Sequence, residues 1–99
     1  MKVRLKKVTI IAERVLKDPL IAMLKLHGAR GFTLTAVEGE GSRGVRASEW
    51  EGRNVSIDTI VSGEVADLLM AAVGERYFDD FAVIIYSVDV DVLRGDKYA

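Results

Sequence analysis

The sequence predicts a single α+β domain, residues 1–99, built from two strand–helix–strand halves that a long loop joins. Runs rich in β-branched side chains alternate with two segments in which apolar residues recur at helical spacing. A glycine-rich, aperiodic stretch separates the halves. With 49% hydrophobic residues, the 99-residue chain can form one core but is too short for two ordinary domains.

The first half begins with a buried strand at residues 8–12, which are mostly β-branched. A helix is then expected between Asp18 and Gly28, because Asp is a favoured N-cap, Pro19 fits the first helical turn, and glycine often ends a helix. Its expected apolar stripe consists of Leu20, Met23, Leu24 and Leu26.

The second and third strands are expected at residues 32–37 and 54–61, where apolar and polar side chains alternate. The third strand should pair antiparallel with the second. Residues 42–53 between them show neither helical nor strand periodicity, so we interpret them as a long exposed loop. Loops of this length in compact domains usually carry function.

The second helix should begin after Ser62 as N-cap and end at Tyr77 and Phe78. Its expected apolar stripe consists of Val65, Leu68, Leu69, Ala72 and Val73. The last strand is expected at residues 81–92, with Asp89 and Asp91 on one face. These carboxylates could bind a hard cation, but the pattern offers no third ligand and favours a solvated face.

This order of elements is the ferredoxin-like βαββαβ arrangement, a four-stranded antiparallel sheet with both helices on one face. We expect the other face to need cover, because Val55, Ile57 and the last strand carry more apolar surface than two short helices can bury. A cyclic homotrimer with its sheets turned inward would provide that cover and create clefts between subunits.

The candidate binding site is the glycine-rich stretch 39–46 at the start of the loop. Glycines allow successive backbone N–H groups to converge on an anion. Arg43 and Arg46 could grip phosphate oxygens in pairs, and Ser42 adds a hydroxyl donor. A solvated hairpin loop is the alternative interpretation of the same residues.

Composition limits the classes of function. The chain has 14 Lys and Arg against 15 Asp and Glu, which argues against nucleic-acid binding by overall charge. It has no cysteine, which excludes disulfides and thiolate metal sites. Neither a membrane-spanning apolar run nor a signal-peptide core is recognisable, so a cytoplasmic location is expected.

Three motifs resemble the PII signal-transduction superfamily: GARGFT at residues 28–33, GSRGVR at 41–46, and YFDDF at 77–81 followed by IIY at 84–86. The nearest likeness is to the branch that contains SbtB, a regulator of bicarbonate transport, and carboxysome-associated PII proteins. The resemblance implies a homotrimer that binds adenine nucleotide between its subunits. Its long loop, the T-loop, would control a target such as a bicarbonate or other membrane transporter.

The resemblance also implies roles for individual residues. Gly41, Ser42, Arg43 and Arg46 would hold the phosphate, and Phe32, Thr33, Ala82 and Val83 would line the adenine side. Val45, Trp50 and Arg53 would contact the protein partner. No catalytic residue, metal ligand or cofactor is implied.

This chain departs from PII proteins where they have a Gly-Asp-Gly-Lys loop, because it has Asp79, Asp80, Phe81 and Ala82 there. Carboxylates would repel the outer phosphates of ATP, so AMP, ADP or cyclic AMP is the expected ligand. Two alternatives share the fold: a small enzyme of acylphosphatase type, and a CutA-like trimeric scaffold or metal-tolerance protein.

Overall fold

The computed structural model describes residues 2–39 and 54–94. The loop predicted at residues 42–53 lies outside this part of the chain. The described elements are β1 (Lys2–Glu13), a 3-10 turn η1 (Arg14–Leu16), α1 (Lys17–Leu26), β2 (Thr33–Val37), β3 (Asn54–Val61), α2 (Gly63–Tyr77) and β4 (Ile84–Leu93). Their order confirms the predicted βαββαβ arrangement, and β3 has the predicted bounds.

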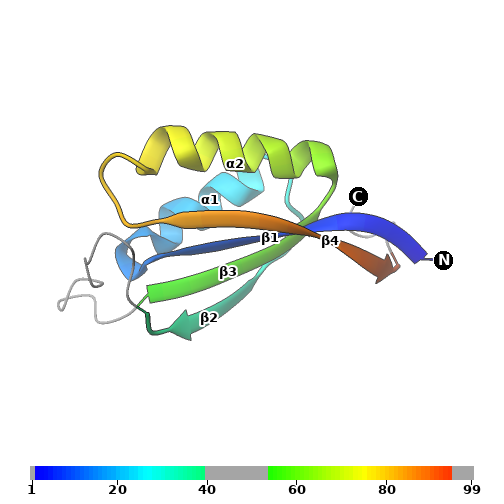
Figure 1. Cartoon of the computed structure of the whole chain (residues 1–99), viewed down its shortest axis with the longest axis horizontal. Helices are drawn as coiled ribbons and strands as arrows, with labels where there is room; N and C mark the ends of the chain where they lie inside the picture. The colour runs from blue at the N-terminus through cyan, green and yellow to red at the C-terminus, as the bar shows by residue number, and fades with distance from the viewer. Residues whose placement is uncertain (1, 40–53, 95–99) are drawn as a thin grey trace.

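The four strands form one antiparallel sheet in the order β2-β3-β1-β4, which leaves β2 and β4 as its edges. Both helices pack on one face of this sheet (Figure 1). The predicted ferredoxin-like α+β fold is therefore confirmed. We call the sheet face away from the helices the open face.

The core lies between the sheet and the helices. Ile10 of β1 is opposite Ile57 of β3 on one side and Ile85 of β4 on the other, so three isoleucines form a row across the sheet. Val55 and Ile57 are only 3% and 1% exposed within this core. Our expectation that these two residues add apolar surface to the open face is wrong, because the register turns them toward the helices.

The start of α1 also differs from the prediction. The N-cap is Leu16, and no side chain caps the helix, because η1 leads directly into α1 ahead of Asp18. Pro19 is the third residue of α1 and is tolerated there because N–H groups of the first turn have no intrahelical partner. Gly28 follows the helix with φ of 99°, a conformation suited to glycine, which confirms the predicted stop.

Both helices bury a slightly different stripe from the one predicted. Leu26 at the end of α1 is 82% exposed, and Leu68 of α2 is 51% exposed. The buried residues of α2 are Ala66, Leu69, Val73 and Tyr77. The N-cap of α2 is as predicted, because Ser62 Oγ accepts a hydrogen bond from the Val65 amide at 3.2 Å.

β1 is longer than the predicted residues 8–12 at both ends, whereas β4 begins at Ile84 and ends at Leu93, compared with the predicted 81–92. β1 pairs with β4 from Lys2 to Ile11, but with β3 only from Lys6 onward. Residues 2–5 therefore pair with β4 alone and project beyond the rest of the sheet (Figure 1). We call this two-stranded extension the β1–β4 arm.

Candidate functional site

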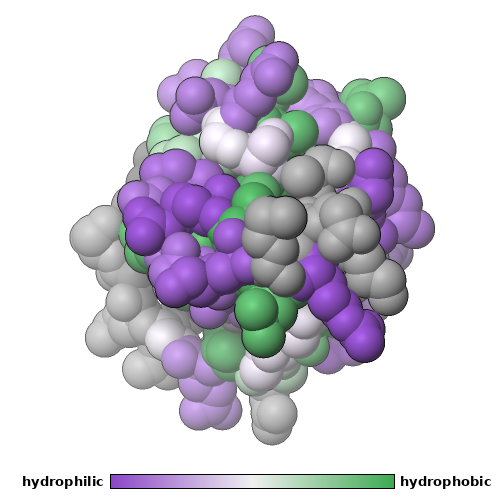
Figure 2. All heavy atoms as spheres, turned by 90° about the vertical axis from the view of Figure 1, so that its right-hand side faces the viewer, coloured by the Kyte–Doolittle hydropathy of each residue, from purple (hydrophilic) through white to green (hydrophobic). Residues whose placement is uncertain are grey.

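The open face carries a band of apolar side chains along β4. Ile84, Tyr86 and Val88 lie there and are 54%, 44% and 46% exposed. Alternation and register continue the band into the arm, where Val90 is opposite Leu5 and Val92 is opposite Val3. Figure 2 looks at the end of the molecule from which the arm projects, and hydrophobic side chains reach the surface there between hydrophilic ones.

The centre of the open face is polar. Thr9 of β1 donates a hydrogen bond from Oγ1 to Asp58 Oδ1 at 2.5 Å, and Lys7 Nζ lies 4.0 Å from the same oxygen. Thr33, one of the predicted nucleotide-binding residues, is the register partner of Asp58 on β2. Sequence periodicity placed Asp58 on a polar face but could not show that Thr9 and Thr33 flank it.

Phe32 and Thr33 lie at the start of edge strand β2, and both are exposed, Phe32 to 41%. The segment before them is attached to β3, because Thr59 Oγ1 donates a hydrogen bond to the Gly31 carbonyl at 2.6 Å. Every residue of β2 is at least partly exposed, since neither helix covers this edge. The predicted adenine side therefore presents apolar and hydroxyl groups directly at the surface.

Ala82 and Val83 lie in the connection from α2 to β4, and both are partly exposed. Turn hydrogen bonds fix this connection: the Asp80 and Phe81 amides donate to the Tyr77 carbonyl at 3.2 and 3.0 Å, and the Val83 amide donates to the Phe81 carbonyl at 3.1 Å. The rings of Tyr77 and Phe81 meet edge to face at 6.0 Å. Ala82 and Val83 thus have a defined position beside the end of α2.

The sheet order separates the two described halves of the predicted adenine side. Phe32 and Thr33 are at the β2 edge, whereas Ala82 and Val83 lead into β4 at the opposite edge. Three strand spacings of about 4.8 Å give a separation of roughly 14 Å across the sheet. One protomer therefore does not bring these two pairs together around a single base.

The predicted phosphate residues Gly41, Ser42, Arg43 and Arg46, and the predicted partner residues Val45, Trp50 and Arg53, lie outside the described residues. The strand ends that flank this loop are described. Val37, which ends β2, pairs with Asn54, which begins β3, and Asn54 in turn pairs with Glu13. The strand ends that flank this loop in the sequence therefore lie at the end of the sheet where the α2–β4 connection enters it.

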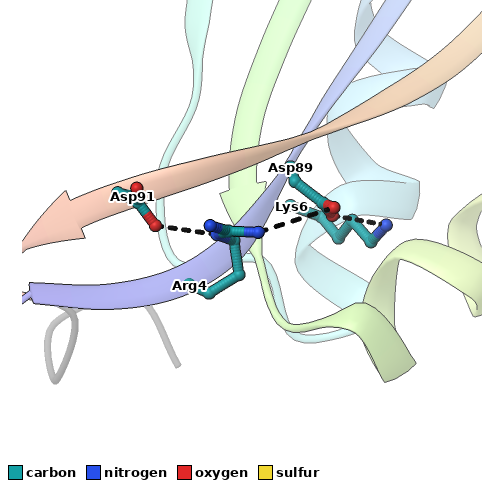
Figure 3. Close-up of polar contacts among 4 residues, drawn as sticks. All are labelled: Arg4, Lys6, Asp89 and Asp91. Carbon is teal, nitrogen blue, oxygen red and sulfur yellow. Dashed lines mark hydrogen bonds and ion pairs between the residues drawn. The ribbon is translucent and has the colours of Figure 1, made fainter.

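Asp89 and Asp91 form a charged array with the opposite strand, as Figure 3 shows. Arg4 Nε lies 2.7 Å from Asp91 Oδ1, Arg4 Nη1 lies 3.8 Å from Asp89 Oδ2, and Lys6 Nζ lies 2.7 Å from Asp89 Oδ1. We call these four residues the ion ladder. Both carboxylates are engaged by cationic side chains, and residues 2–39 and 54–94 contain no acidic or histidine cluster that could hold a metal ion.

The ion ladder perturbs two of its own groups. The hydrogen bond and charge of Lys6 hold the pKa of Asp89 below its ordinary value, with a smaller contribution from Arg4. The hydrogen bond and charge of Asp91 raise the pKa of Arg4. All four side chains are well exposed, so these are surface pairs of modest strength.

The model of the nitrogen regulatory protein P-II family matches residues 5–97, nearly the whole chain. The chain therefore belongs to the P-II family. It is also 48% identical to a putative PII-like signaling protein from Thermus thermophilus, over 99% of this chain and 98% of that one, with a TM-score of 0.87. Members of the P-II family are signalling regulators.

Two further structures with the P-II fold come from Thiomonas intermedia. They are CPII bound to ADP, AMP and acetate (23% identity over 99% of this chain and 97% of that chain, TM-score 0.87) and CPII bound to ADP and bicarbonate (24% identity over 100% and 98%, TM-score 0.87). At this identity they show a common fold. No helix in the described part of this P-II chain is long and apolar enough to cross a membrane.

Proposed function

We infer that this P-II protein is a homotrimeric regulator that binds an adenine nucleotide at clefts between its subunits. The observation that carries this proposal is the position of Phe32 and Thr33 at one edge of the sheet and of Ala82 and Val83 at the other. A site that uses both pairs requires the β2 edge of one copy beside the β4 edge of the next. The ADP and AMP bound to the CPII structures support an adenine nucleotide as ligand.

The same pairing of edges supports a closed ring. A contact between two different surfaces of one chain is heterologous, and heterologous contacts close into rings when the rotation allows it. In a trimer the apolar band at Ile84, Tyr86 and Val88 would turn inward and leave water. Each cleft would then combine residues of two copies, with Gly41, Ser42, Arg43 and Arg46 of the loop at the phosphate.

The charge beside the predicted adenine side favours a nucleotide with few phosphates. Asp79 and Asp80 are exposed directly before Phe81, in the connection that also carries Ala82 and Val83. Their carboxylates would repel additional phosphate charge. We therefore expect AMP, ADP or cyclic AMP to bind more tightly than ATP. We also expect this binding to need no metal ion held by the protein.

We further propose that the loop of residues 42–53 contacts a protein target through Val45, Trp50 and Arg53. The likeness of the motifs to SbtB favours a membrane transporter as that target, and a bicarbonate transporter is one candidate. The bicarbonate bound to one CPII structure is consistent with this assignment. The protein would act in the cytoplasm as a regulator and not as an enzyme.

Isothermal titration calorimetry with AMP, ADP, ATP and cyclic AMP tests the proposal. We expect one nucleotide per subunit and the weakest binding for ATP. The double variant Asp79→Asn, Asp80→Asn should increase the affinity for ATP more than that for AMP, because it removes charge without changing size. The variant Asp67→Asn on α2 is the control for loss of an exposed carboxylate. If none of the four nucleotides binds at millimolar concentration, the proposed function is wrong.

A further inference from the structure

Thr59 is the polar member of an otherwise apolar row. It lies in β3 with Val55, Ile57 and Val61, all on the face that the helices cover, and it is 3% exposed. A hydroxyl in such a place is costly unless it is hydrogen bonded. Its bond to the Gly31 carbonyl, at 2.6 Å, therefore ties a buried strand to the connection between α1 and β2.

The hydrogen bond from Thr59 reaches the chain just before the backbone pairing of β2 with β3 begins. The β2–β3 ladder starts at Thr33 opposite Asp58, so Gly31 and Phe32 precede it. At the other end of the connection, the Ala29 amide donates to the Leu24 carbonyl at 2.9 Å, which closes the end of α1. Thr59 and the end of α1 thus hold residues 29–31 from both sides.

We propose that Thr59 is a positioning residue for nucleotide binding: its hydroxyl fixes the Gly31 carbonyl and thereby sets where Phe32 and Thr33 meet the ligand. The inference rests on the proposed function, because it assigns a cause to the placement of two of the proposed binding residues. Thr59 itself lies on the buried face and does not contact the nucleotide. Its effect passes through the two backbone units between Gly31 and Thr33.

Two substitutions separate the hydroxyl from the shape of the side chain. Thr59→Val keeps the branched shape but cannot donate to Gly31, whereas Thr59→Ser keeps the donor and removes only a methyl group. The matched control is Ser62→Ala, which removes the N-cap of α2 and destabilises the fold without touching the connection at residues 28–33. All variants are studied as the assembled full-length protein.

We expect Thr59→Val to weaken ADP binding, measured by calorimetry, by roughly threefold to tenfold, the usual effect of losing one neutral hydrogen bond. Thr59→Ser should bind ADP nearly as well as the wild type, and so should Ser62→Ala despite its lower melting temperature. Hydrogen exchange of residues 29–33 should be faster in Thr59→Val and unchanged in Ser62→Ala.

Three outcomes would overturn the inference. They are wild-type ADP affinity in a folded Thr59→Val variant, an equal loss of affinity in Ser62→Ala, and a loss in Thr59→Ser as large as in Thr59→Val. If Thr59→Val does not fold, the exchange rates of residues 29–33 in the wild type and in Thr59→Ser decide, because a positioning role requires those amides to be protected wherever residue 59 keeps its hydroxyl. Absence of ADP binding to the wild type would instead refute the proposed function.

Discussion

Arg4 and Asp91 are 87 positions apart in the sequence, yet Arg4 Nε donates a hydrogen bond to Asp91 Oδ1 at 2.7 Å. With Lys6 and Asp89, just inside the sheet, they form the ion ladder, which continues along one face of the β1–β4 arm. Alternation places Leu5 and Val90 on the opposite face of the arm. The arm therefore has a charged side and an apolar side, which allows one side to face water while the other is covered.

The ion ladder predicts a dependence of stability on acid pH. The pKa of Asp89 is lowered in the folded protein, mainly by Lys6, so its contribution to stability is present above the ordinary value of 3.8 and is lost as the pH falls through the lower folded pKa. The raised pKa of Arg4 gives a contribution that is fully present at neutral pH and is lost only in strong alkali, as the pH rises through the folded value.

We therefore expect Asp89→Asn to lose less stability than the wild type as the pH falls below about 4, as measured by urea unfolding. Asp67→Asn, an exposed carboxylate variant on α2, should follow the wild type. High salt should reduce the difference between Asp89→Asn and the wild type, because it screens exposed pairs. Identical acid profiles for Asp89→Asn and the wild type would show that the ladder does not contribute to stability.

The apolar band predicts how the protein assembles. Ile84→Asp should prevent trimer formation, because it would place a carboxylate opposite the apolar Ile11 in the proposed interface. Leu68→Asp is a close control, since Leu68 is also about half exposed but lies on α2, away from the open face. In light scattering, the wild type and Leu68→Asp should have three times the mass of the 10.9 kDa chain. A monomeric wild type at micromolar concentration would contradict the trimer.

Arg46 is predicted to carry much of the nucleotide affinity. Arg46→Ala should weaken ADP binding by about 1.5–3 kcal/mol, which is roughly tenfold to a hundredfold, because it removes a charge-assisted contact to phosphate. Arg53→Ala removes the same charge from the other end of the loop and should leave ADP binding nearly unchanged. Calorimetry measures both. Unchanged affinity in Arg46→Ala would show that the phosphate binds elsewhere.

Trp50 should report on nucleotide binding. It is the only tryptophan in the chain, and we propose that a phosphate bound by Ser42, Arg43 and Arg46 restricts the positions open to it. We expect its fluorescence to change on addition of ADP and hydrogen exchange in residues 42–53 to slow. The Arg46→Ala variant should show neither change at the same ADP concentration. If saturating ADP leaves both signals of the wild type unchanged, the loop is not the switch.

The sequence by itself determined the order of elements, the bounds of β3, the Ser62 cap and the Gly28 stop. These features depend on residues that are close together in the sequence. They follow from side-chain periodicity, from helix capping and from the backbone freedom of glycine. The start of α1 shows the limit of such local signals. Asp18 is a good N-cap by type, but η1 continues into the helix before it is reached.

Only the tertiary structure decided which face each strand buries and which distant residues meet. Val55 and Ile57 could have lain on either face until the register with β1 turned them toward the helices. The contact of Thr59 with Gly31 also depends on strand pairing, which joins segments far apart in the chain. The separation of Phe32 from Ala82 depends on strand order, and no local pattern encodes strand order because it is set by how all four strands pack together.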